Sequence, residues 1–382
     1  MMAAMLSRVS AIAAKEFAHI RRDPRTLIAV LIVPIMQLML FSYAISFDVK
    51  AVPTVVLDQD GTSASRAYLQ TYRSSDFFAI KGSINDLASV DEAFRNHLAQ
   101  VAVVVPPGFG RSLAKGEKAQ VFVIVDGTEP NAAQLGQAYT VALNQLYDNK
   151  VLVKWADRQG FDTTQLGRIE PRIRTWYNPE RKSADFLIPG LMVVIIMIVT
   201  VQQTAVTLVR ERDLGTEEQM MVSPLRLPEL MFAKLLPWTL LAFVDMVVIA
   251  LVGLYYFHVP LRGSVMFLSV SAGFFVFASL GLGLIISAIA PSMESANIIA
   301  IMVAFLPAFL LSGFAFPLES IPPVLQGVSY LFPARYMIVI SRGVFLKGAG
   351  FNELWPQLAL LGGYSLLVIA LASVLYGRRA AR

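Results

Sequence analysis

A polar stretch inside an otherwise hydrophobic half of the chain holds the residues best suited to specific chemistry. It runs from Val209 to Trp238, carries nine charged residues, and lies between two apolar runs of about membrane length. This is more charge than lipid accepts, so the stretch belongs in water. Met220 and Met221 interleave with the charges and form an adaptable apolar face of the kind that packs into a partner's groove. We interpret the stretch as a short docking helix that carries force from a separate partner protein into the helices around it.

The order of residues in this stretch fits a short helix with defined ends. Gly215 permits a turn out of the preceding apolar run, Asp213 or Thr216 can cap the helix, and Pro224 and Pro228 end it. The two glutamates after Thr216 suit the positive end of the helix dipole. The alternative is a solvated loop with routine charges. We assign the docking role to Arg210, Glu211, Arg212, Gly215, Thr216, Glu217, Glu218, Met221, Ser223 and Pro224.

A second signal is a carboxylate within an apolar run, because Asp245 stands midway along the residues that follow the docking stretch. A charged group at the centre of a bilayer costs about 2.5–3.5 kcal/mol on insertion scales, so it should face protein or water. It is either a pathway or switch residue, or it makes a structural hydrogen bond to Gln202 or Gln203 on a neighbouring helix. The polar residues that we assign to a pathway inside the membrane are Gln202, Gln203, Asp245 and Asn297.

The sequence gives little support to an enzyme. The three histidines lie in three different regions, and the chain has no cysteine, so no metal site and no thiol nucleophile is expected. The stretch from Gly110 to Glu117 resembles a phosphate-binding loop, but its spacing is wrong and Glu117 stands where the lysine should be. We therefore predict no catalytic residue and no cofactor bound by this chain. Any dependence on ATP must come from another subunit.

Composition predicts the fold class. The chain is 56% hydrophobic and 15% charged, with a mean hydropathy of +0.60, which is typical of a polytopic membrane protein. The segment 48–185 differs, because it holds sixteen basic and sixteen acidic residues, like an ordinary soluble domain. We predict a polytopic α-helical membrane protein with six transmembrane helices and an α/β domain between the first and second. The net charge of +5 belongs to the membrane part and does not suggest nucleic acid.

The predicted organisation follows from apolar runs and turn signals. A basic amphipathic helix occupies 1–25, the first transmembrane helix 26–47, the α/β domain 48–185, a five-helix membrane region 186–377, and a short tail 378–382. A signal peptide with its apolar core at 26–46 is the alternative for the start of the chain. Within the membrane region we place the docking helix at 210–228 and short re-entrant helices at 317–353.

Alternating apolar runs and polar breaks predict the elements of the α/β domain. We expect strands at 52–57, 77–81, 101–105, 121–125 and 172–176, and helices at 63–72, 84–98 and 130–159. The later membrane spans are predicted at 186–208, 235–257, 264–290, 296–316 and 355–376. Closely spaced Gly281 and Gly283 should let the fourth span pack tightly against its neighbours.

Positive charge in the short loops predicts the orientation. With both termini inside, the inner loops hold twelve Lys and Arg residues and the outer loops hold four. The docking stretch is then cytoplasmic, and the α/β domain is outside.

These features together resemble the ABC-2 type permease family, the membrane subunits of ATP-binding-cassette exporters, and within it the bacterial multidrug-type permeases. The likeness covers essentially the whole chain. It is carried by Lys15-Glu16-Phe17, Arg22-Asp23-Pro24-Arg25, Asp58-Gln59-Asp60, Arg210-Glu211-Arg212, Gly215-Thr216-Glu217-Glu218, Ser223-Pro224-Leu225, Leu311-Ser312-Gly313-Phe314, Phe316-Pro317 and Pro333-Ala334-Arg335-Tyr336.

The resemblance implies partners that composition does not show. Two permeases, identical or sister chains, would pair in the bacterial inner membrane, and each would dock an ATPase subunit through a coupling helix at 213–223. ATP and Mg would be bound by that ATPase. The helix at 1–25 would be the family's connecting helix, and the proline-rich segment would close the exit, with Phe314, Phe316 and Pro317 as an outer gate. A periplasmic adaptor and an outer-membrane channel are further expected partners.

The leading hypothesis is therefore the permease subunit of an ATP-driven exporter that moves amphipathic or apolar cargo, drug-like or lipid-like, outward. One alternative is a membrane-anchored ligand sensor or assembly factor that works without an ATPase. The other is an ion-coupled secondary transporter that uses Asp245, although no inverted repeat supports it.

Overall fold

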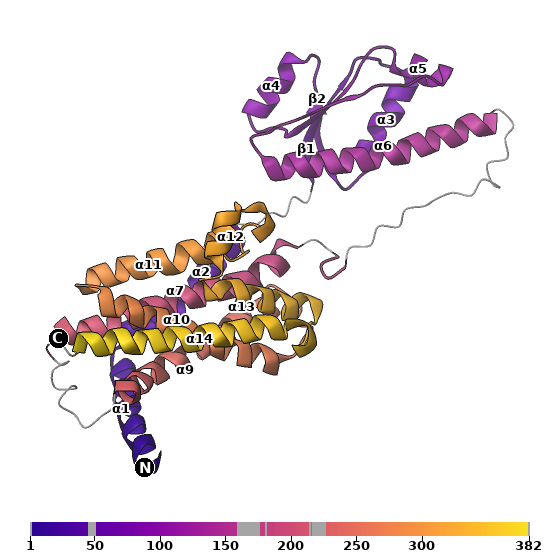
Figure 1. Ribbon diagram of the computed structural model, residues 1–382. Helices are drawn as coiled ribbons and strands as arrows, with labels where there is room; N and C mark the ends of the chain where they lie inside the picture. The colour runs from indigo at the N-terminus through magenta and orange to yellow at the C-terminus, as the bar shows by residue number, and fades with distance from the viewer. Residues whose placement is uncertain are drawn as a thin grey trace. The chain divides into compact units, whose positions relative to one another are not determined.

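The computed structural model describes residues 2–44, 51–158, 176–179, 182–213, 215 and 227–380 (Figure 1). The chain divides into two compact units. The helical unit comprises Met1–Ser46 and Arg174–Arg382, and the α/β unit comprises Phe47–Ile173. The division after Ile173 comes twelve residues before the predicted end of the outer domain at Asp185, because α7 (Ser183–Asp213) already belongs to the helical unit.

The α/β unit contains a four-stranded sheet in the order β2-β1-β3-β4. β1 runs parallel to β2 and to β3, and β4 runs antiparallel to β3. All five residues of β3 are buried, as expected for an apolar strand that is covered on both faces. The strands predicted at 52–57, 77–81, 101–105 and 121–125 are confirmed as β1 (Val52–Asp58), β2 (Phe78–Ser83), β3 (Val101–Val105) and β4 (Phe122–Val125).

Four helices accompany the sheet. On one face, strand residues pack with Tyr68, Tyr72 and Phe109, and on the other with Val90 and Ala93. The prediction missed the short helix α5, which follows a turn at Pro106-Pro107. The strand predicted at 172–176 lies almost entirely outside the described residues. The helices are α3 (Ser63–Arg73), α4 (Ala88–Arg95), α5 (Phe109–Lys115) and α6 (Pro130–Arg158).

Among the described residues of the helical unit, five helices are long and apolar enough to cross a membrane: Ser183–Asp213, Ala233–Tyr255, Val265–Ile289, Met293–Leu310 and Phe351–Leu375. The first predicted span corresponds to α2, whose shorter apolar part is Val30–Ala44. The segment predicted to be re-entrant consists of short helices. The elements are α1 (Met2–Arg22), α2 (Pro24–Ala44), α7, α9 (Leu227–Tyr255), α10 (Val265–Ile289), α11 (Met293–Leu310), η1 (Leu318–Ser320), α12 (Pro323–Ser329), α13 (Pro333–Arg342), η2 (Gly343–Lys347) and α14 (Phe351–Ala380).

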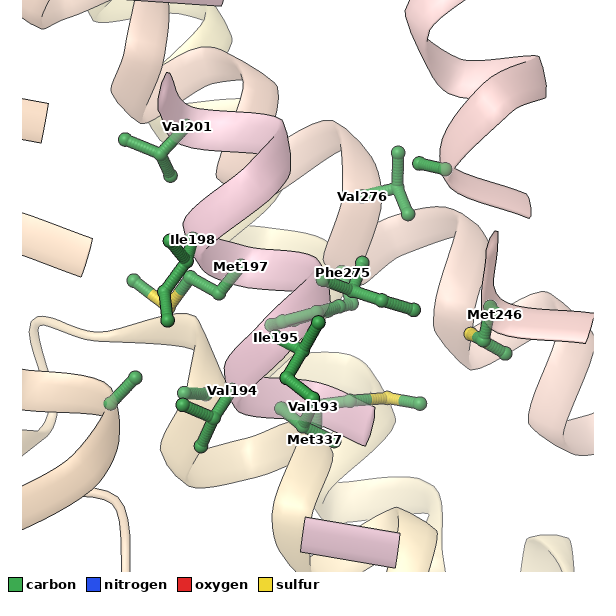
Figure 2. Packing of buried hydrophobic residues seen from close by; sticks show 14 of the residues in the cluster. Val193, Val194, Ile195, Met197, Ile198, Val201, Met246, Phe275, Val276 and Met337 are labelled. Atoms are coloured by element: carbon green, nitrogen blue, oxygen red, sulfur yellow. The ribbon is translucent and has the colours of Figure 1, made fainter. Parts of the chain in front are cut away.

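Helix α7 is the centre of this unit. It packs against α2, α9, α10, α11 and α13, and its residues from Leu187 to Met197 are all buried. Figure 2 shows side chains of α7 among those of neighbouring helices, such as Phe275 and Met337. The close packing predicted for the fourth span is confirmed, because a Cβ on Gly283 would lie 2.6 Å from the carbonyl oxygen of Val201 in α7.

Helix α11 meets α7 through a stripe of alanines. Every fourth residue of α11, namely Ala296, Ala300, Ala304 and Ala308, is fully buried. Between these positions, the larger side chains of Ile298, Ile301, Met302, Leu306 and Leu310 are exposed. One face of the helix is therefore smooth and packed, and the other is bulky and open.

In the α/β unit, the side chain of Asp60, in the loop after β1, binds the loop after β3. The Asp60 carboxylate accepts hydrogen bonds from the Thr62 hydroxyl and from the backbone N–H groups of Gly108 (2.8 Å) and Gly110 (3.0 Å). These bonds, above all the one from Thr62, hold the pKa of Asp60 below its ordinary value. Since the folded pKa is depressed, this contribution to stability is present at neutral pH and is lost as the pH falls through the folded pKa.

We predict that Asp60→Ala lowers the thermal stability of the α/β unit at neutral pH, and that the gap from the wild type closes under acid. Proteolytic release of α3 and α5 peptides from the heated full-length chain measures this unfolding at each pH. Asp76→Ala, at an exposed acid in the same unit, is the matched control. If the difference in thermal stability between Asp60→Ala and the wild type stays constant with pH, the charge of the carboxylate does not hold the two loops together.

Candidate functional site

The C-terminal end of α7 carries the first residues that we assigned to docking. Arg210 is exposed, whereas the Glu211 carboxylate forms an ion pair with the Lys234 ammonium on α9. The Lys234 side chain is 4% exposed and that of Glu211 is 18% exposed. The pair therefore joins the last turn of α7 to the early part of α9, on either side of residues 214–226.

Most of the predicted docking helix lies outside the described residues: Thr216, Glu217, Glu218, Met221, Ser223 and Pro224. Gly215 is described. It has a φ of +69°, and its N–H donates to the carbonyl oxygen of Arg212 at 3.0 Å. The turn predicted there is confirmed, because this left-handed conformation favours glycine.

Arg212 holds a third element. Its guanidinium donates to the carbonyl oxygens of Ala290 (2.8 Å) and Pro291 (3.1 Å), where α10 ends and the chain turns into α11. A cation is favourable there because the last carbonyls of a helix have no partners within the helix. Ser292 and Ser295 then form a capping box that begins α11. The turn between α10 and α11 is thus fixed to the end of α7.

Helix α1 completes this region. Ala13 and Ile20 are buried, and the helix packs against α9. Lys15 and Glu16 of α1 lie within electrostatic range of the Lys234 ammonium. The predicted basic amphipathic helix is therefore present, and it contacts protein on its buried side. We call α1, the last turn of α7, the first turns of α9 and the turn between α10 and α11 the coupling region.

The polar residues predicted inside the membrane region have separate environments. The Gln202 side-chain amide donates to the Asn297 side-chain oxygen at 2.6 Å, which ties α7 to α11. The hydrogen bond considered between Asp245 and Gln202 or Gln203 is absent from the described residues. Asp245 is 3% exposed, in the α9 stripe that also buries Met246, and no described residue hydrogen-bonds to its carboxyl group.

At the opposite end of α7, an arginine that we had counted only as a loop charge holds the segment after α11. The Arg342 guanidinium on α13 donates to the carbonyl oxygens of Gly313 (2.8 Å) and Phe314 (3.1 Å). It also lies 3.7 Å from the ring centroid of Phe186 on α7. The only hint in the sequence is its position inside an apolar segment.

The predicted gate residues differ in exposure. Phe314 is 1% exposed and packs edge-on to Phe309, whereas Phe316 is 55% exposed and Pro317 is also exposed. Gly190 of α7 leaves space for the Phe314 ring to pack against α7, because a Cβ there would lie 2.5 Å from that ring. Phe314 and Arg342 thus hold the segment after α11 against this end of α7.

No three His, Asp or Glu side chains gather into a possible metal site among the residues that the structure describes. The coupling region and the contacts of Arg342 both join helices to one another.

Comparison with known proteins gives related membrane proteins. The model of the ABC-2 family transporter protein family matches residues 24–374. The chain is 30% identical over 342 residues to the probable multidrug ABC transporter permease YbhS of Escherichia coli K12, covering 89% of each chain. It is 27% identical over 361 residues to the probable multidrug ABC transporter permease YbhR of the same strain, covering 93% of this chain and 95% of that one.

A third relative is the inner membrane transport permease YhhJ of Escherichia coli K12, 29% identical over 269 residues and 68% of each chain. The family match runs from the start of α2 almost to the end of α14. The α/β unit and the helical unit from α2 onward therefore fall within it, except for the last residues of α14. The chain belongs to the ABC-2 transporter family.

Proposed function

We propose that the chain is the membrane-spanning permease subunit of an ABC exporter that moves amphipathic or apolar cargo outward, driven by a separate ATPase subunit. The coupling region is the observation that carries this proposal. There, the ends of α7 and α9 that flank 214–226 are joined by an ion pair, and the end of α7 is hydrogen-bonded to the turn between α10 and α11. A partner that moved residues 214–226 would therefore act on four long helices at once.

The energy source in this proposal is external. The chain lacks a phosphate-binding loop, so ATP and Mg are bound by the partner ATPase. Closure of the ATPase dimer displaces the docking segment, and the segment shifts α7 and α9. Two permeases pair, identical or sister chains, and the cargo path runs between them along α7 and α11, near Gln202 and Asn297. The names of the relatives, which include multidrug permeases, support a drug-like cargo.

Topology follows from charge. With twelve basic residues in the inner loops against four outside, both termini and the coupling region are cytoplasmic. The α/β unit is then periplasmic, α2 supplies a sixth span, and the chain lies in the bacterial inner membrane. In this orientation Phe314, Phe316 and Pro317 lie at the outer face. A periplasmic adaptor and an outer-membrane channel would contact the α/β unit.

We predict that Glu217→Arg combined with Glu218→Arg abolishes co-purification of the ATPase and leaves the level of the permease unchanged. The reversed charges oppose the helix dipole and any basic surface on the partner. A pull-down with identification of the bound proteins measures it. Glu294→Arg, at an exposed acid in the first turn of α11, is the control at the same end. If the double variant still co-purifies the ATPase, the assignment of these residues to docking is wrong. If no ATPase co-purifies with the wild type, the sensor hypothesis is favoured.

For Asp245 the proposal predicts opposite effects on stability and transport. Asp245→Leu should raise the melting temperature of the purified permease, because it removes a buried carboxyl group that no described residue hydrogen-bonds. The same change should reduce ethidium efflux from cells if the carboxylate serves the pathway. Asp245→Asn separates charge from shape. Equal losses of stability and efflux would show a purely structural residue, and efflux driven by a proton gradient without an ATPase would favour the secondary transporter.

Arg342 allows a test of the gate. Because the chain contains no cysteine, Phe316→Cys gives a unique exposed thiol in the gate segment. Adding Arg342→Met should speed maleimide labelling of that thiol, since the change removes both hydrogen bonds to the loop at Gly313 and Phe314. Arg335→Met on the same helix is the control. If the labelling rate is the same with and without Arg342, this arginine does not hold the gate segment in place.

A further inference from the structure

We infer that the Glu211–Lys234 ion pair makes α7 and α9 respond to the ATPase as one body, and that Arg212 extends this response to α10 and α11. The inference rests on the proposed function and adds the residues that transmit movement inside the permease. Glu211 and Arg212 were assigned to the docking surface from sequence. The contacts that the structure describes for them instead lie within the helical unit.

Position is the first argument. Glu211 lies five residues before Thr216, and Lys234 lies eight residues after Arg226, so the pair connects both ends of 214–226. A displacement of that segment could otherwise be absorbed by spreading of the two helix ends. An ion pair across the ends opposes spreading, because separating the charges leaves each in a poorly solvated place.

Burial is the second argument. Ala233 and Leu235, on either side of Lys234, are buried, and so is Val209 on α7, two residues before Glu211. In such surroundings a pair of charges is often no more stabilising than two apolar side chains of similar volume, whereas breaking it by removing one partner is costly. A buried pair therefore does little for stability that leucines could not do, but its fixed geometry specifies how the two helices are placed.

The remaining contacts show where movement would go. The guanidinium of Arg212 ties the end of α7 to the carbonyl groups that close α10. Further along, Gly283 brings α10 against the α7 backbone at Val201. Because the contact at Gly283 leaves no room for a side chain between the two backbones, a sideways shift of α7 displaces α10. The hydrogen bonds of Arg212 extend that shift to the turn that begins α11.

The test separates transmission from folding. Glu211→Leu, Lys234→Leu and the double variant are made in a chain with Phe316→Cys as its only thiol, and each is reconstituted with the ATPase. Each single change strands a buried charge and should lower the permease level. The double change should restore the level and the co-purification of the ATPase. We expect it to reduce the ATP-dependent change in maleimide labelling about tenfold, which lies within the usual range of coupling between sites.

Two further variants sharpen the result. Lys234→Arg keeps the charge and should keep the ATP response, whereas Glu294→Leu, at an exposed acid in the first turn of α11 and outside the coupling region, should change nothing. A double leucine variant with a full ATP response would overturn the inference. If that variant does not accumulate, a loss in Lys234→Arg as severe as in Lys234→Leu would overturn it. A wild-type complex without any ATP response would count against the proposed function instead.

Discussion

The confinement of α7 is the constraint on which the rest of the helical unit depends. Five other helices pack around it, and along its first half every side chain from Leu187 to Met197 is buried. Protein interiors are packed like crystals, so such a helix cannot rotate or bend without displacing its neighbours. Rotation or bending of α7 is therefore shared with the helices around it. The polar contacts at its two ends, through Glu211 and Arg212 at one and through Phe186 at the other, determine which neighbours go with it.

The distribution of polarity follows from the same constraint. Buried polar groups are costly unless paired. Here the charged groups that are paired lie where helices end, whereas buried Thr and Ser hydroxyls along α7, α9 and α10 bond to carbonyl oxygens of their own helix. Carbonyl groups without partners in the helix accept from Arg212 at the end of α10 and from Arg342 after α11. Nearer the middle of the helices lie the hydrogen bond between Gln202 and Asn297 and the carboxyl group of Asp245, to which no described residue hydrogen-bonds. Helix ends are thus fixed in space while their central parts meet through apolar surfaces.

The sequence predicted what depends on local pattern. Apolar runs of about twenty residues located the helices α7, α9, α10, α11 and α14, and short apolar runs between polar breaks located the four described strands. It did not predict which polar side chains meet, since Glu211 and Lys234 are joined by the fold across a segment whose path sequence alone does not give. Arg342 was missed for the same reason. Gln202, one of the two partners considered for Asp245, donates its hydrogen bond to Asn297, because α7 turns Gln202 toward α11. The short helix α5 was missed because a double proline and two glycines surround it.

The alanine stripe of α11 has a kinetic consequence. Alanine has no side-chain torsion to rearrange, so sliding α11 along α7 requires no rotamer changes on the alanine side of the interface. A helix that interdigitates through leucines or phenylalanines must unlock each of them before it moves. Of the helices around α7, α11 therefore has an interface suited to sliding. The hydrogen bond from Gln202 to Asn297, near the start of α11, must break before the helix slides.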